Sequence, residues 1–312
     1  MRKVILDCDP GHDDTLAMLL AHANPEIDLL AVTTVAGNQT LEKVTQNARK
    51  VMTVAGIRKT LLAAGADRPL VRELSTGEYI HGVTGLDGYN FPPPTVNVDK
   101  RHAADLIIDL LHAHDKITLI PTAPLTNIAL ALRKDPTIIP KIEEIVLMGG
   151  SNSIGNVNPL SEANIWIDAE AADIVFRSSV PLTMIGLNLT HQAKATPKVV
   201  ERIRKLDNEV ARMAVGLIDF FASTYRKHFH FDAPPIHDAC AVARVINPAL
   251  VKCEFVNVVV EIKGTYTYGA TVSDMEGITG RPANCNVATH LDFDGFWDLM
   301  IDALRSYGSA RA

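Results

Sequence analysis

Short runs of aliphatic and β-branched residues alternate with helical patterns along this chain, and this alternation is the strongest constraint on its fold. VILDC at 4–8, DLLAVTTVA at 28–36 and EEIVLM at 143–148 are such runs. Strands that alternate with helices favour a parallel sheet. We therefore expect an α/β fold with an open, mostly parallel, Rossmann-like sheet and helices on both faces. The active site should lie at the carboxyl ends of the strands.

The 312 residues contain no internal repeat, low-complexity tract or Ser/Gly-rich linker, so we expect one domain over residues 1–312. The formal net charge of -6 gives no basic footprint for nucleic acid or an anionic membrane. The apolar run after the N-terminus is too short for a signal peptide, and nothing resembles a membrane span of about 20 apolar residues. Four scattered cysteines suit reduced thiols. These features predict a cytoplasmic protein with no nucleic-acid or membrane partner.

The helical patterns can be given approximate bounds. We expect helices at 12–23, 41–54, 208–233, 237–246 and 293–307, and further strands at 60–65, 117–122, 180–187, 253–262 and 284–293. The stretch 67–98 lacks periodicity and is longer than a connection needs, as functional or mobile loops often are. We treat it and 208–233 as candidate lids.

The stretch LDCDPGHDD at 6–14 places four carboxylates directly after an apolar run. Side chains alternate along a strand, so Asp7 and Asp9 should share a side, and a Pro-Gly turn should bring Asp13 and Asp14 back at a helix start. The helix dipole explains only the second pair, at about 0.3–1 kcal/mol each. A hard divalent cation such as Ca²⁺ or Mg²⁺ explains all four.

A phosphotransferase of the haloacid dehalogenase type also begins with Asp-x-Asp after its first strand. Thr or Val normally follows there at the position of Gly11, whereas this chain continues with Pro10, Gly11 and His12. The chain has no GxxxxGK[ST] motif, and no Lys or Arg lies within its motifs to bind a phosphate. A metal-dependent phosphotransferase or phosphatase is therefore the second interpretation.

The acidic stretch has companions downstream: VAGNQT at 35–40, IHGVTGLDG at 80–88, GGSNSIGNVNPLSEANIWIDAEAA at 149–172 and PPIHDA at 234–239. Together they resemble the inosine-uridine preferring nucleoside hydrolase family, from the first strand to the last helix. The resemblance implies a Ca²⁺-dependent N-ribohydrolase that converts purine or pyrimidine ribonucleosides to ribose and free base in nucleoside salvage, and a homotetramer. A non-catalytic nucleoside- or ribose-binding protein is the third interpretation.

The resemblance also implies roles for individual residues. The Ca²⁺ ligands would be Asp9, Asp14, the carbonyl of Thr122 and Asp238. Asp9 would act as general base toward the attacking water, and His237 would donate a proton or a hydrogen bond to the departing base. The substrate-binding residues would be Asp13, Asn38, His81, Met148, Asn156, Glu162, Asn164, Tyr225 and Phe229. Ionised carboxylates beside the sugar would stabilise an oxocarbenium-like transition state.

Some positions leave alternatives open. Ala163 and Ala123 stand where the family commonly has an aromatic residue and Gly, and Ala163 could leave a void or be covered by another side chain. Tyr225 and Phe229 could contact the base, or could form a helix stripe that packs on the core at i, i+4 spacing. For the pair of histidines at 228 and 230 we expect no partner and partial exposure.

Overall fold

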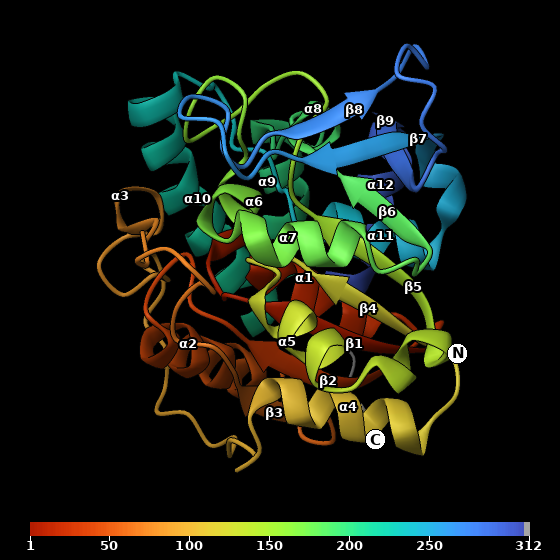
Figure 1. Ribbon diagram of the computed structural model, residues 1–312. Coiled ribbons are helices and arrows are strands. Elements are labelled where there is room, and N and C mark those ends of the chain that lie inside the picture. The colour runs from red at the N-terminus through yellow and green to blue at the C-terminus, as the bar shows by residue number, and fades with distance from the viewer. Residues whose placement is uncertain (309–312) are drawn as a thin grey trace.

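The computed structural model describes residues 1–308 and contains a nine-stranded open sheet in the order β3-β2-β1-β4-β5-β6-β9-β7-β8 (Figure 1). The strands are β1 Arg2–Cys8, β2 Ile27–Thr34, β3 Leu61–Ala64, β4 Ile117–Pro121, β5 Ile142–Met148, β6 Leu182–Ile185, β7 Val251–Val260, β8 Thr271–Asp274 and β9 Cys285–Leu291. Neighbours from β3 through to β9 pair in parallel, and β7 is antiparallel to both β8 and β9. The expected open, mostly parallel sheet is confirmed.

Helices cover both faces of the sheet. They are α1 His12–Ala23, α2 Leu41–Val54, α3 Glu78–His81, α4 Ala103–Ala113, α5 Thr126–Lys134, α6 Ala163–Ile167, α7 Ala169–Phe176, α8 Leu187–Thr190, α9 Pro197–Arg204, α10 Glu209–Phe229, α11 Ala239–Ile246 and α12 Phe293–Ser306, with 3₁₀ turns at Pro136–Lys141 and Pro248–Leu250. In Figure 1, α4, α5 and α7 lie in front of the sheet. Within residues 1–308 no helix combines the length and apolarity needed to cross a membrane.

The alternation of side chains along β1 divides the core into two layers. Val4 and Leu6 join the cluster that contains α1 and α10 to α12, while Ile5 joins the cluster of α4, α5 and α7. All three side chains are buried completely. Strand β1 is therefore covered on both faces, as its continuous apolar run predicts.

The predicted helix bounds agree closely with the structure at the N-terminal end. α1 and α2 begin and end where expected, but the helix predicted over 208–233 ends at Phe229. His230 adopts a left-handed conformation there (φ 58°, ψ 29°), and its N–H donates to the carbonyl of Tyr225. A left-handed residue of this kind ends a helix. The helix predicted from 237 begins at Ala239, with Asp238 as its N-cap.

The predicted loop 67–98 contains one short helix, α3, and lies against α10. At the contact, Gly88 has φ of +114°, and a Cβ added to Gly216 of α10 would lie 2.5 Å from the carbonyl oxygen of Gly88. The two backbones can approach this closely only because neither residue has a side chain. The start of α3 is held beside the loop after β2, where the N–H of Gly77 donates to the carbonyl of Asn38 at 3.0 Å and the amide of Gln39 donates to Glu78 at 3.0 Å.

Candidate active site

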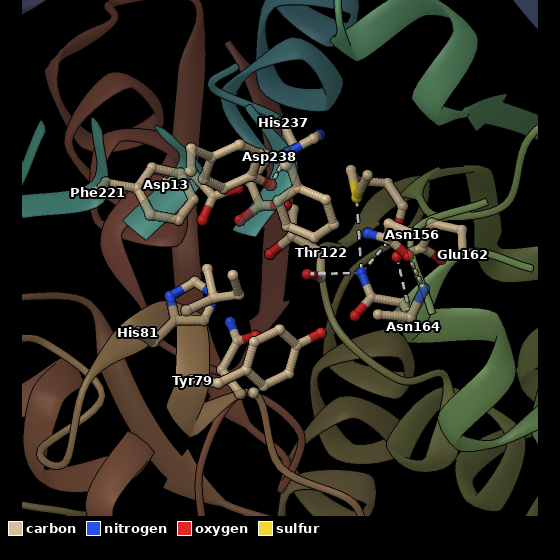
Figure 2. Close-up of a pocket in the computed structure, with 17 residues that line it drawn as sticks. Asp13, Tyr79, His81, Thr122, Asn156, Glu162, Asn164, Phe221, His237 and Asp238 are labelled. Carbon is tan, nitrogen blue, oxygen red and sulfur yellow. Dashed lines mark hydrogen bonds between the residues drawn. The ribbon is translucent and has the colours of Figure 1, made fainter. Parts of the chain in front are cut away.

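A pocket opens where the loops after β1, β2, β4 and β5 meet α3, α10 and the turn before α11 (Figure 2). Its lining comprises Asp13, Asn38, Gly77, Tyr79, Ile80, His81, Thr122, Met148, Asn156, Glu162, Ala163, Asn164, Phe221, Tyr225, Phe229, His237 and Asp238. Every residue predicted to bind substrate is in this set. Asp9 and Asp14 are absent from it, and both are buried. The structure thus gathers residues from most of the chain at the predicted edge of the sheet.

Three of the carboxylates form a compact buried group. Asp13 and Asp14 lie in the first turn of α1, Asp238 precedes α11, and one oxygen of each lies within 4.8 Å of the others. Burial raises the pKa of Asp13 to about 7, and also raises the pKa values of Asp14 and Asp238. No Lys or Arg lines the pocket in the described part of the chain. A divalent cation would neutralise negative charge on these three carboxylates.

Asp9 lies next to this group and is held by Asn38. Its carboxylate accepts from the Asn38 backbone N–H at 2.6 Å and from the Asn38 side-chain amide at 3.2 Å, while its own N–H donates to Asp14. Burial, and then the charge of Asp14, raise the pKa of Asp9 well above its usual range. Asp9 is outside the group of three because its oxygens are directed toward Asn38.

Thr122 connects the acidic group to the opposite wall of the pocket. Its hydroxyl donates to Asp14 at 3.1 Å, and its carbonyl accepts from the side-chain amide of Asn164 at 3.2 Å. The predicted metal ligands Asp9, Asp14, Thr122 and Asp238 all offer oxygen atoms, which is the donor set that hard cations require. The residues present therefore fit a Ca²⁺ or Mg²⁺ ion.

The expected convergence of four carboxylates is wrong for Asp7. Its Oδ1 accepts from the hydroxyl of Thr33 at 2.6 Å and from the amide of Asn127 at 2.8 Å, and its Oδ2 has no partner within the described residues 1–308. β1 ends at Cys8, so the strand alternation that would align Asp7 with Asp9 does not continue. Asp7 lies on the side of α5 instead, and links β1 to β2 and α5.

The wall after β5 is organised by Glu162. As N-cap of α6, Glu162 accepts from the N–H groups of Asn164 at 2.8 Å and Ile165 at 3.1 Å, and it also accepts from Gly150. Burial raises the pKa of Glu162 to about 7. The side-chain amide of Asn164 donates to the carbonyls of Thr122 and Met148, and its Oδ1 has no donor among residues 1–308. The Oδ1 of Asn156 accepts from the N–H of Ala163 at 2.9 Å, so this wall combines acceptors with the amide N–H₂ of Asn156, which is a donor.

Across the pocket, His237 has both ring nitrogens engaged. Nδ1 lies 2.7 Å from the hydroxyl of Thr190, and Nε2 lies 2.7 Å from the hydroxyl of Tyr225. Burial lowers the pKa of His237 well below its usual range and raises that of Tyr225 well above its own. Tyr225 packs against Phe229 with ring centroids 5.1 Å apart, and both line the pocket. Tyr225 and Phe229, four residues apart on α10, therefore pack on the core and also line the pocket.

Several lining residues were missed in the sequence. Tyr79 and Ile80 adjoin His81 on α3, and Phe221 precedes Tyr225 by four residues on α10, so adjacency and helical spacing were signals that could have found them. Ala163 lines the pocket without filling it.

The two histidines at the end of α10 lie outside the pocket lining. Both are exposed, as expected. His228 does have a partner, because its ring meets the edge of Tyr79 with centroids 5.5 Å apart. His230 has the separate role of ending the helix. Ala123, the other departure from the family pattern, is fully buried behind Thr122.

Buried carboxylates, amide groups and histidines around one pocket, at the carboxyl ends of a doubly wound parallel sheet, define a metal-dependent enzyme for a small polar ligand. The chain belongs to the inosine-uridine preferring nucleoside hydrolase family, whose model matches residues 4–298. The family resemblance seen in the motifs is thereby confirmed.

Individual relatives agree along the whole length. The chain is 51% identical to an inosine-uridine preferring nucleoside hydrolase of Leishmania major, over 98% of both chains. It is 46% identical to the pyrimidine-specific ribonucleoside hydrolase RihA of Shewanella sp. (strain ANA-3), over 98% of this chain and 97% of that one. A solved structure of a purine-preferring ribonucleoside hydrolase from Gardnerella vaginalis superimposes with a TM-score of 0.92 at 33% identity, and covers 98% of this chain and 99% of that chain. The chain is accordingly a nucleoside hydrolase that acts on ribonucleosides.

Proposed function

We propose that this hydrolase depends on Ca²⁺ and releases ribose and free base from purine or pyrimidine ribonucleosides in nucleoside salvage. The observation that carries the proposal is the buried group of Asp13, Asp14 and Asp238, whose charge has no Lys or Arg beside it in the pocket. The relatives are named for inosine and uridine, for pyrimidines and for purines, so we assign recognition to the ribose that these substrates share.

We propose that Asp9, Asp14, the carbonyl of Thr122 and Asp238 hold the cation. When bound, the cation supplies positive charge that makes a neighbouring water more acidic. Asp9 then accepts the proton of the attacking water, a role that suits a carboxylate fixed by two hydrogen bonds from Asn38.

The ribose hydroxyls provide the second part of the proposal. Asp13, Asn38 and Asn164 bind the 2′- and 3′-hydroxyls, and Met148, Asn156 and Glu162 lie around the 5′-hydroxyl. As the glycosidic bond breaks, positive charge develops on the ribosyl ring, and the nearby carboxylates stabilise it more than they stabilise the ground state. The Oδ1 of Asn164, for which residues 1–308 offer no hydrogen-bond donor, supports this assignment, because a ribose hydroxyl can donate to it.

The departing base occupies the opposite end, between His81 and the aromatic side chains of Tyr225 and Phe229. We assign its protonation to His237, directly or through the Tyr225 hydroxyl that lies 2.7 Å from Nε2. A base that leaves as a neutral molecule is a better leaving group than its anion.

We further propose one catalytic domain over residues 1–312, of which 309–312 lie outside the described residues, and a cytoplasmic homotetramer. The family match over 4–298 supports the single domain. All four cysteines are free thiols, which suits a reducing compartment. The family resemblance is the support for the tetramer.

The test is to incubate the purified protein with a panel of ribonucleosides and the matching 2′-deoxyribonucleosides, with and without phosphate. We expect free base and ribose without phosphate, loss of activity with a chelator, and recovery with Ca²⁺. Deoxyribosides should react at least about 5-fold more slowly, since each unpaired buried group costs about 1–3 kcal/mol. Ribose 1-phosphate as product, an unchanged rate after chelation, or equal kcat/KM for uridine and deoxyuridine would each contradict the assignment it tests.

A further inference from the structure

His12, within the DPGHDD motif, has no part in the function proposed above. Its ring is buried behind His81, with the two Nδ1 atoms 3.2 Å apart, and its Nε2 lies 2.8 Å from the carbonyl oxygen of Asp87. The ring is parallel to those of Phe220 and Phe221, with centroids 5.1 and 5.2 Å away. His12 is therefore held in one orientation by aromatic packing and two hydrogen bonds.

These contacts determine where the protons are. A carbonyl oxygen can only accept, so Nε2 of His12 carries the hydrogen that bonds to Asp87. In a neutral imidazole the other nitrogen is then an acceptor, and Nδ1 of His12 requires a donor. Its hydrogen-bond partner is Nδ1 of His81, 3.2 Å away. That nitrogen must carry a hydrogen, and Nε2 of His81 is left as a lone pair.

Nε2 of His81 has no hydrogen-bond partner among residues 1–308, although the side chain is only 7% exposed and lines the pocket. We propose that His12 is a positioning residue that holds His81 as the Nδ1–H tautomer, so that His81 presents a hydrogen-bond acceptor to the ligand. The ligand group it meets is then a donor, an N–H or an O–H. The identity of the ligand rests on the proposed function, whereas the tautomer does not.

This assignment gives the two histidines of the pocket, His81 and His237, different roles. His81 has no proton at Nε2 to give, so it does not act as the acid that protonates the departing base. A base that has gained a proton from elsewhere becomes an N–H donor, and the lone pair of His81 can accept a hydrogen bond from it. Both side chains are buried, with His12 1% and His81 7% exposed, and burial disfavours the charged form of an imidazole ring.

The tautomer can be read without substrate. In protein labelled with ¹⁵N at the histidine rings, magic-angle-spinning NMR should show His81 with a protonated Nδ1 and an unprotonated Nε2. A scalar coupling between the Nδ1 nuclei of His12 and His81 should appear across their hydrogen bond. The His81→Asn variant assigns the signals. A protonated Nε2 on His81, or a protonated Nδ1 on His12, would overturn the inference, and neither result depends on whether the protein hydrolyses nucleosides.

Two substitutions at residue 12 test the positioning role. His12→Asn keeps an acceptor oxygen at the position of Nδ1, whereas His12→Leu fills similar space with no acceptor. We expect His81 to keep its tautomer in His12→Asn and to show mixed tautomers in His12→Leu. For ribonucleosides, His12→Leu should also raise KM about 3- to 10-fold relative to His12→Asn, the effect of one hydrogen bond. An unchanged tautomer in His12→Leu would refute the role of His12. If neither variant folds, the NMR of the unaltered protein still decides.

Discussion

His237 is the residue whose surroundings most restrict its chemistry. With Thr190 at one ring nitrogen and Tyr225 at the other, it can pass a proton toward the pocket only by way of the Tyr225 hydroxyl or after a change of partner. Thr190 and Tyr225 both contact His237 through hydroxyl groups, which can either donate or accept a hydrogen bond. A proton can therefore move between His237 and Tyr225 without leaving a buried group unpaired.

We expect His237→Ala to slow the hydrolysis of natural ribonucleosides by about 10²- to 10⁴-fold, the usual contribution of a general acid. p-Nitrophenyl riboside should be affected much less, because p-nitrophenolate leaves without a proton. The measurement is kcat/KM for both substrates, with Tyr225→Phe as a matched test of the hydroxyl route. Equal losses on both substrates would instead make His237 a positioning residue for ribose or for Asp238.

Asp9 should behave differently from His237. Because water must be activated whatever the leaving group, Asp9→Ala should lose nearly all turnover on both substrates, by at least about 10²-fold. Steady-state rates with inosine, uridine and p-nitrophenyl riboside would show this. If Asp9→Ala still hydrolysed the activated riboside at the normal rate, another group would be the base.

At the scale of elements, the pocket depends on how α3 is held against α10. The contact between Gly88 and Gly216 allows the 67–98 stretch to lie directly on the helix. α3 in turn carries Tyr79, Ile80 and His81 into the pocket lining.

Gly216→Ala is therefore expected to move the loop rather than to stabilise the helix. In an exposed helix interior this change would gain about 1 kcal/mol, but here the new Cβ would lie 2.5 Å from a backbone oxygen that has to shift. We expect a higher KM for ribonucleosides and a lower Tm. Ser223→Ala, at an exposed position on the same helix, is the control and should leave KM unchanged without lowering Tm. A raised Tm with normal KM in Gly216→Ala would show that the contact does not position α3.

The sequence was most informative where a periodic pattern lasted for several turns. The approximate bounds predicted for α1 and α2 agree with the structure, in which α1 buries every residue from 12 to 21 and α2 buries a spaced set between Val44 and Met52. α3 could not be found, since four residues are too few for a period to appear. The end of α10 was placed four residues too late because the left-handed backbone of His230 gives no signal in an aromatic, His-rich run.

For the site, the motifs identified residues of the pocket, but they did not show which of these residues contact one another. The quoted motifs contain most of the pocket, yet they gave no sign that Asp7 bonds to Thr33 and Asn127, since these partners lie 26 and 120 residues away in the chain. The link from His81 to His12 also depends on tertiary packing, 69 residues apart.

For the whole molecule, the buried acids predict how stability changes with pH. Asp7, Asp13 and Glu162 have folded-state pKa values of about 7, well above those of the unfolded chain, so the folded state binds more protons and loses stability as pH rises. Histidines with lowered pKa values, such as His12 and His191, oppose this only below about pH 6.5. Above about pH 6.5, the change of stability with pH therefore reports the acids and not these histidines.

Between pH 6.5 and 8, we expect the metal-free protein to lose about 1 kcal/mol of stability for each of these three acids. Bound Ca²⁺ should reduce the loss, because its charge favours the ionised form of Asp13. Thermal unfolding with chelator and with Ca²⁺ at both pH values is the measurement. A metal-free protein equally stable at pH 8 would contradict the raised pKa values.

The proposed homotetramer is also tested on the whole molecule. Sedimentation velocity at micromolar concentration should give a species of about four times the chain mass of 33.9 kDa. A single species at the mass of one chain would refute the tetramer without affecting the assignment of the site.

The separation of the site carboxylates along the chain has a consequence for biosynthesis. Asp14 and Asp238 are 224 residues apart (238 − 14), although β1 can pair with β2 and β4 as soon as residue 121 has emerged. At about 5–20 residues per second, a ribosome needs roughly 10 to 45 seconds to cover that distance. During this interval the acidic turn after β1 lacks Asp238, the third member of the carboxylate group. Capture of a cation by the complete site is consequently a late event in the life of the nascent chain.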